Sequence, residues 1–151
     1  MKPLQPIIPM SIFLHHSLTR DDEIVNWTGV RRWHMGLISS SPYKMRDIGY
    51  HFGIEKIKSR HEILIGRMMK DQGAHVRGWN RDSLGILFIG NFDKKPPPEE
   101  QWKLGLNLVS TLCSVFLIPL NNVYGHREFD PNKTCPGTAF DLNLFRSQLV
   151  N

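Results

Sequence analysis

The chain has 151 residues, among them two cysteines, with 40% hydrophobic and 22% charged residues and a formal net charge of +5. This length predicts a single domain whose core needs no disulfide scaffold. No apolar run reaches the roughly 20 residues that cross a bilayer, and the N-terminus has no small-residue cleavage site, so we expect neither membrane insertion nor a secretory signal. The basic charge favours anionic partners, but the sequence has no zinc-finger spacing and no Lys/Arg run with interleaved aromatics, which argues against nucleic acid.

The first half of the chain predicts short strands separated by loops. We expect strands over 11–16, 48–55 and 62–66, a helix over 28–36 that a glycine closes, and loops over 37–46 and 71–82. In the second of these strands Tyr50, Phe52 and Ile54 alternate with His51 and Gly53. This alternation predicts that the first three side chains share one face of the strand.

The second half contains the most hydrophobic strand and the clearest helix. The run LGILFI at 84–89 is predicted to lie at the centre of the sheet. After a turn over 91–98, Pro98, Glu99 and Glu100 favour the first turn of a helix. Its apolar residues recur at helical spacing and predict a buried stripe, made of Trp102, Leu106, Val109, Leu112, Cys113 and Phe116.

A short strand over 122–124 and a last helix complete the predicted fold. Asp141 caps this helix, and its apolar face includes Leu144, Phe145 and Leu149. Strands alternate irregularly with helices, so we expect an α/β fold with a single mixed central β-sheet flanked by about three helices. The whole chain, 1–151, is predicted to be one domain with its core over about 11–149.

The segment YGHREFDPNKTCPG at 124–137 concentrates polar side chains between prolines and glycines. Because proline fixes φ and lacks an N–H, we expect an ordered loop and no regular helix or strand. His126 and Cys135 are both zinc-ligand types, and a catalytic zinc takes three protein ligands and keeps a fourth position open. His15 or His16 is the natural third ligand, and the strand pleat allows only one of them to face the ion. From spacing alone, a metal site and ordinary surface histidines are about equally favoured.

Four motifs stand in the order and approximate spacing of one family: IFLHHS at 12–17, DIGYHF at 47–52, GAHVRGWNRDSLGI at 73–86 and GHREFDPNKTCPG at 125–137. Over about residues 11–149 the chain resembles the type-2 N-acetylmuramoyl-L-alanine amidases, which include phage lysozymes of the T7 kind and share their fold with the peptidoglycan recognition proteins. The resemblance implies a catalytic domain of this fold with one zinc ion. The implied reaction is hydrolysis of the amide between the lactyl group of N-acetylmuramic acid and L-alanine in peptidoglycan.

The resemblance also implies roles for individual residues. The implied zinc ligands are His15 (and not His16), His126 and Cys135. The implied catalytic residues are Tyr50 and Lys133, whose hydroxyl and ammonium groups are suitable donors to the oxyanion of amide hydrolysis. The implied substrate-binding residues are His34, His75, Trp79 and Asn80.

Each of these assignments has a structural alternative. Tyr50 is otherwise a half-buried strand aromatic, and Lys133 is otherwise a solvated loop lysine. The four implied substrate-binding residues, which would line a groove, would otherwise serve packing and turns. Glu128 either orients His126 through its free ring nitrogen or is an ordinary surface charge. The remaining histidines are expected to be structural, with hydrogen bonds in or near the core for His16 and His51 and an exposed position for His61.

The chain departs from the family near the presumed groove. The loop over 37–46 is longer, EKIKSRHE at 55–62 replaces an Asp-Gly turn, and Trp79 stands where tyrosine is frequent. These changes bear on substrate preference more than on the chemistry.

The rival interpretation is a non-catalytic recognition module that binds peptidoglycan. Such members typically lack the cysteine, which this chain keeps as Cys135. We therefore expect a monomeric zinc amidase, made in the cytoplasm without a signal peptide and acting on the cell wall after release or export, as an endolysin does. A role in muropeptide recycling is the alternative context.

Overall fold

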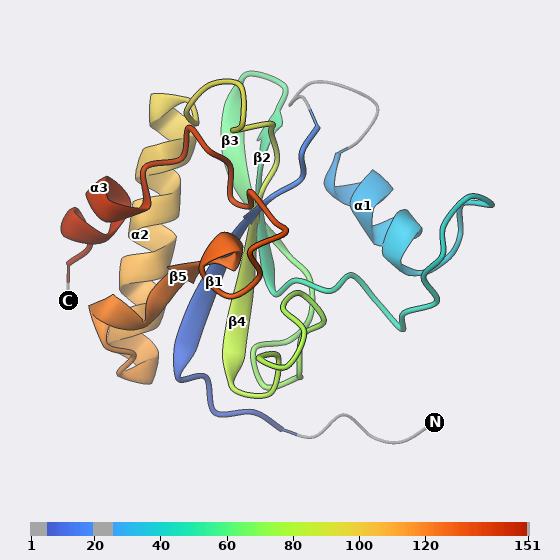
Figure 1. The fold of residues 1–151 in the computed structure, drawn as a ribbon, viewed down its shortest axis with the longest axis horizontal. Helices are drawn as coiled ribbons and strands as arrows, with labels where there is room; N and C mark the ends of the chain where they lie inside the picture. Colours follow the sequence, from blue (N-terminus) through green and yellow to red (C-terminus); the bar gives the residue numbers. More distant parts are fainter. Residues whose placement is uncertain (1–5, 20–25, 151) are drawn as a thin grey trace.

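The computed structural model describes residues 6–19 and 26–150, and it has one five-stranded sheet with helices on both faces (Figure 1). The strands of this described part are β1 (Ser11–His16), β2 (Phe52–Ile57), β3 (Arg60–Ile65), β4 (Ser83–Phe88) and β5 (Val123–Gly125). Its α-helices are α1 (Trp27–His34), α2 (Glu99–Phe116) and α3 (Leu142–Ser147), and two 3₁₀ turns are η1 (Leu120–Asn122) and η2 (His126–Glu128). The predicted α/β fold with one mixed sheet is confirmed.

The strand order is β3-β2-β4-β1-β5, so the most hydrophobic strand, β4, lies at the centre as predicted. β4 runs parallel to β1 and β2, β5 runs parallel to β1, and β3 is antiparallel to β2. All six residues of β4 are buried, as expected for a parallel strand covered on both faces. The parallel pairing brings the carboxyl ends of β1, β4 and β5 to one edge of the sheet.

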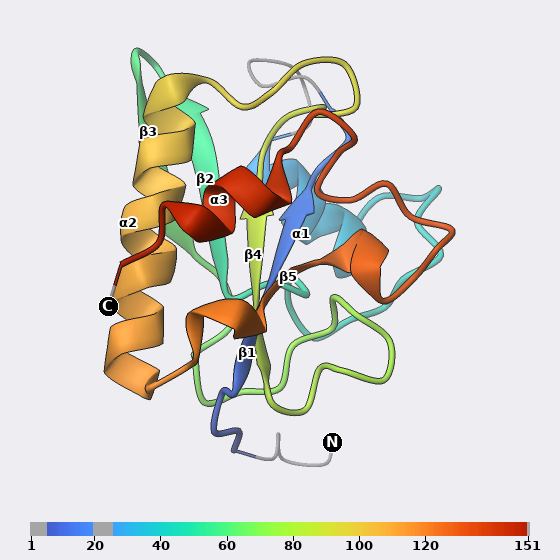
Figure 2. The same ribbon diagram turned by 60° about the vertical axis from the view of Figure 1, so that its left-hand side comes forward.

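The helices form two layers around the sheet: α2 and α3 cover one face, and α1 covers the other (Figures 1 and 2). Beneath α2 and α3, the ring of Phe88 packs against those of Phe140 and Phe145 in the larger core. The predicted stripe of α2 faces this core: three of its residues are buried, Val109, Leu112 and Cys113, and the other three are partly buried and pack against the core, Trp102, Leu106 and Phe116. A smaller cluster beneath α1 consists of Trp27, Ile48, Leu87 and Ile89.

α1 begins one residue before its predicted start and ends two residues before its predicted end. The Asn26 side chain accepts a hydrogen bond from the Gly29 N–H and caps the helix. After the helix, Gly36 has φ +71, a left-handed conformation that glycine adopts without steric cost.

The prediction of a strand over 48–55 is wrong at its first four residues, because β2 begins only at Phe52. Tyr50 lies before the strand and packs against the cluster beneath α1, whereas Phe52 and Ile54 belong to the core beneath α2. These three side chains therefore do not share a face. Sequence alternation continues through the segment, but regular strand pairing does not.

EKIKSRHE forms part of the hairpin between β2 and β3, whose turn includes Lys58 at φ +57. Two smaller expectations are corrected. His61 is buried, and its Nδ1 lies 2.9 Å from a Glu100 carboxylate oxygen at the start of α2. Leu144 is 47% exposed, so the buried face of α3 holds Phe145 without it.

Among the described residues, none of the helices combines the length and the apolar character that a membrane-spanning segment requires.

Candidate metal centre

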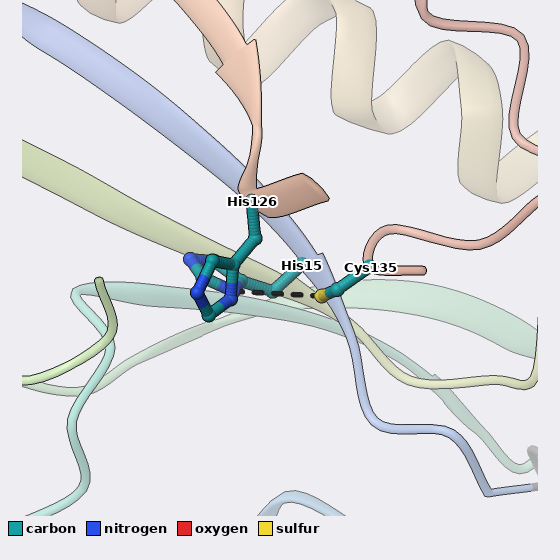
Figure 3. A group of neighbouring side chains, drawn as sticks. All are labelled: His15, His126 and Cys135. Atoms are coloured by element: carbon teal, nitrogen blue, oxygen red, sulfur yellow. Dashed lines mark hydrogen bonds between the residues drawn. The ribbon is translucent and has the colours of Figure 1, made fainter. Parts of the chain in front are cut away.

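Three side chains from distant parts of the chain meet at the carboxyl edge of the sheet (Figure 3). His15 lies near the end of β1, His126 directly follows β5, and Cys135 lies in the loop beyond η2. One imidazole nitrogen from each histidine and the cysteine sulfur all lie within 4.8 Å of one another. Two imidazoles and one thiol at this spacing are a suitable donor set for a zinc ion.

The parallel pairing of β1 with β5 explains why the two histidines are neighbours. Leu14 is opposite Gly125 in this ladder, so the next residues, His15 and His126, emerge side by side with ring centroids 4.9 Å apart. A Cβ added at Gly125 would lie 2.8 Å from Cδ of Pro136. The glycine thus leaves room for the cysteine-bearing loop to fold back against the strand.

Hydrogen bonds of Arg127 and Asp93 hold the loop that carries Cys135. The backbone N–H of Arg127 donates to the Cys135 carbonyl at 2.8 Å, and the Arg127 guanidinium donates to three further carbonyls in and after this loop. The Asp93 carboxylate accepts from the Thr134 hydroxyl and from the Thr138 N–H, each at 2.9 Å. The predicted loop is confirmed after Glu128, but the expectation of no regular structure over 124–137 is wrong at its start, because Tyr124 and Gly125 end β5 and the next three residues form the 3₁₀ turn η2.

The protonation states of these groups follow from burial. Burial raises the pKa of the Cys135 thiol to about 12, so without a cation the sulfur is protonated at neutral pH. Burial, followed by the neighbouring histidines, holds the pKa of His15 well below its ordinary value, and burial also lowers the pKa of His126. Both rings are therefore neutral, as metal ligands must be.

His15, and not His16, faces the other two side chains. The Nδ1 of His15 lies 3.5 Å from the Cys135 sulfur, whereas the Nδ1 of His16 accepts a hydrogen bond from the Phe92 N–H at 3.1 Å. The backbone N–H of His16 donates to the sulfur at 3.2 Å. The expected structural hydrogen bonds of His16 and of His51, whose Nδ1 accepts from a strand N–H, are confirmed.

A cavity of about 620 Å³ opens beside the three side chains. Besides them, its lining consists of His16, Leu18, His34, Tyr43, Met45, Tyr50, Ala74, His75, Val76, Arg77, Asn80, Asn132, Lys133 and Thr134. In the described part of the chain, the lysine and arginine side chains of this lining are Lys133 and Arg77, and both are cationic. A molecule bound in the cavity would therefore meet both the candidate metal site and these positive charges.

Tyr50 and Lys133 both line this cavity. The ring of Tyr50 lies 5.0 Å from that of His15 and 5.5 Å from that of His34, between centroids. Burial, and secondarily Cys135, raises the pKa of Tyr50 above its ordinary value. The phenol therefore stays protonated and is a hydrogen-bond donor.

Three of the four predicted substrate-binding residues line the cavity, but two of them also hold the structure around it. His34 accepts a hydrogen bond from a backbone N–H at 2.9 Å, and Asn80 accepts from two backbone N–H groups of its own loop. His75 is buried against His15. Trp79 lies outside the lining, is 48% exposed and packs edge-on against a phenylalanine ring, so its substrate-binding role stays a prediction.

Sequence reasoning missed several residues of the site. Arg77 stands inside the motif GAHVRGWN, so it could have been found there, but Tyr43 and Met45 come from the loop that departs from the family and carry no periodic pattern. The Glu128 carboxylate accepts from the Gly125 N–H at 2.8 Å and pairs with Arg146. Its contacts therefore stabilise the turn that bears His126.

Comparisons with known proteins agree with this arrangement. A family model described as N-acetylmuramoyl-L-alanine amidase matches residues 6–138. Peptidoglycan-recognition protein 2 of Holotrichia diomphalia is 32% identical over 154 residues, which cover 97% of this chain and 72% of that protein. The endolysin of Escherichia phage T7 is 30% identical over 148 residues, covering 93% of this chain and 88% of the endolysin.

Solved structures show the same fold. The N-acetylmuramoyl-L-alanine amidase LysC from Clostridium intestinale URNW superimposes with a TM-score of 0.79 at 24% identity, covering 97% of this chain and 89% of LysC. Drosophila peptidoglycan recognition protein SD gives a TM-score of 0.72 at 21% identity, covering 95% of this chain and 85% of that one. The expected amidase and recognition-protein fold is confirmed.

Proposed function

We propose that one zinc ion, held by His15, His126 and Cys135, is the catalytic centre of this chain. The chain belongs to the N-acetylmuramoyl-L-alanine amidase family and is a peptidoglycan amidase. The observation that carries the proposal is the convergence of three ligand atoms within 4.8 Å beside an open cavity. The donor set fits zinc, because both rings are neutral and a bound cation would stabilise the thiolate of Cys135. Zinc supplies, when bound, a nucleophile at neutral pH and a Lewis acid for the carbonyl.

Tyr50 and Lys133 are proposed to stabilise the charge that develops on the carbonyl oxygen. Both line the cavity that holds the ligand atoms, and the tyrosine is a protonated donor. Donors that are already in place act most strongly where water is excluded, and Tyr50 is partly buried beside the rings of His15 and His34. The proton for the leaving amine comes from one of these two groups or from the nucleophile itself.

The proposed substrate is the junction between N-acetylmuramic acid and the stem peptide. Stem peptides carry carboxylates, and the cavity lining includes the cationic side chains of Arg77 and Lys133. His34, His75 and Asn80 would form the walls of the groove. Cleavage between the lactyl group and L-alanine is the reaction that the family name describes.

The context that we propose is that of an endolysin-like monomer which acts on the cell wall after release or export. The endolysin of phage T7, of which the matched region covers 88%, supports this choice. The rival is a recognition module without activity, which the similarity to peptidoglycan-recognition protein 2 supports in part.

The test is hydrolysis of purified peptidoglycan, scored by newly exposed L-alanine amino termini. It compares zinc-loaded, chelator-treated and Cys135→Ala protein at matched folding. New termini that appear only with zinc and only with Cys135 support the proposal. Retention of wall fragments without new termini in the zinc-loaded protein would establish the recognition module instead.

A further inference from the structure

A hydrogen-bond relay of polar groups starts at the candidate ligand His15 and runs through His75 and Ser83 to a backbone carbonyl. His75 Nδ1 lies 3.2 Å from His15 Nε2, and His75 Nε2 lies 3.4 Å from Ser83 Oγ. The Ser83 hydroxyl in turn lies 2.6 Å from the Trp79 carbonyl oxygen. His15, His75 and Ser83 are all buried.

The carbonyl at the end of this relay determines the direction of every hydrogen bond in it. The Trp79 carbonyl can only accept, so the Ser83 hydroxyl must donate to it. Ser83 Oγ can then only accept from His75, which places the proton of the neutral ring on Nε2. His75 Nδ1 is left as an acceptor, so His15 must donate from Nε2.

We propose that His75 is a positioning residue that holds His15 in the Nε2–H tautomer, which leaves Nδ1 of His15 unprotonated and ready to bind a metal ion. This Nδ1 is the nitrogen that lies 3.5 Å from the Cys135 sulfur. The proposal rests on the proposed function for the ligand set, and it assigns to His75 a role distinct from that of a groove wall. Partners that fix the tautomer of a ligand histidine commonly strengthen metal binding.

The packing around His75 supports this role. Cβ atoms added at Gly73 or Gly85 would both lie 2.5 Å from atoms of the His75 ring, so the ring fits between two positions that carry no side chain. The ring is therefore held in place by sterics as well as by hydrogen bonds.

The test measures the tautomer and the metal affinity separately. Nitrogen-15 NMR of the imidazoles in metal-free protein reports which nitrogen of His15 carries the proton, and competition with a chelator reports the zinc affinity. In the wild type we expect Nε2–H on His15. In His75→Leu the tautomers should become mixed and zinc affinity should fall by about 10–100-fold.

Three further variants make the test specific. His75→Asn keeps an acceptor near the position of Nδ1, so it should restore the tautomer and most of the affinity. Ser83→Ala removes the end of the relay with little change in volume, so it should mix the tautomers even if the His75 variants fold poorly. His61→Leu is the matched control, since it removes a buried histidine elsewhere in the fold and should leave the tautomer of His15 and the zinc affinity unchanged.

An Nδ1–H proton on His15 in the metal-free wild type would overturn the proposal. An unchanged tautomer and affinity in both His75→Leu and Ser83→Ala would also overturn it. If the tautomer responds as expected but zinc does not bind the wild type, the relay stands and the proposed zinc function fails.

Discussion

His15 Nδ1 and Cys135 Sγ lie 3.5 Å apart although 120 residues separate them in the chain. A metal ion bound between these atoms would tie β1 to the loop that follows η2. Because the unfolded chain does not hold the ligands together, the free energy of metal binding adds to the free energy of unfolding. The site is thus expected to affect stability as well as activity.

Zinc should stabilise the wild type and not Cys135→Ser. For one site, free ligand at about 100 times its Kd adds roughly 2.7 kcal/mol to the free energy of unfolding. Thermal unfolding with and without zinc measures this difference. The matched control is Cys113→Ala, which removes the other cysteine from the core beneath α2, so it should lower stability and still respond to zinc. An equal response of Cys135→Ser to zinc would contradict the ligand assignment.

Tyr50→Phe should lower kcat by about 10²–10³-fold, the usual cost of removing one oxyanion donor. Zinc affinity should stay near that of the wild type, because the hydroxyl is not a proposed ligand. Peptidoglycan hydrolysis at saturating substrate is the measurement. Tyr43→Phe, in the lining of the same cavity, is the control and should keep full kcat. A wild-type kcat in Tyr50→Phe would show that the hydroxyl is not an oxyanion donor and that the tyrosine serves only packing.

Asp93→Ala should loosen the loop that carries Cys135. The carboxylate accepts two hydrogen bonds at 2.9 Å from Thr134 and Thr138, and a net contribution of about 1 kcal/mol each is typical. We expect lower stability in urea and weaker zinc binding together. Asp82→Ala removes an exposed carboxylate and should change neither. A lower free energy of unfolding with unchanged zinc affinity would show that these hydrogen bonds of Asp93 do not support the metal site.

The stability of the metal-free protein should fall as the pH drops below 6.5, the ordinary pKa of histidine. Burial lowers the folded-state pKa of His15, His16, His51 and His75. Below 6.5 the unfolded chain therefore binds more protons than the native state, and its free energy falls relative to that of the native state. This contribution is complete above the unfolded pKa and is lost as the pH falls toward the folded values.

Urea unfolding at a series of pH values checks this expectation. Among the described residues, the carboxyl groups with lowered pKa are Glu99, Glu100 and Asp93. They contribute mainly below their ordinary values of 4.5 and 3.8, so the interval from 6.5 to 4.5 reports mainly the histidines. A free energy of unfolding that stays constant across this interval would show that the histidines are solvated.

Periodicity alone determined the parts of the fold that are regular and buried. The uninterrupted apolar run of β4 requires cover on both faces, and the helical spacing from Trp102 to Phe116 requires one buried side, so both were predictable from local pattern. Motif order also indicates His15, His126 and Cys135 as candidate ligands.

The tertiary structure decided what depends on contacts between distant segments. The strand pattern left His15 and His16 open, and the family resemblance implied His15. The physical reason lies in the fold: the pairing of β1 with β5 sets His15 beside His126, and His16 accepts a hydrogen bond from the Phe92 N–H. The expected exposure of His61 was wrong because the start of α2, far along the chain, covers it. A hydrogen bond to a buried imidazole depends on which groups the fold brings within about 3 Å, and no local pattern carries that distance. For the same reason the sequence determined that His75 is present, and only the folded chain placed it against His15.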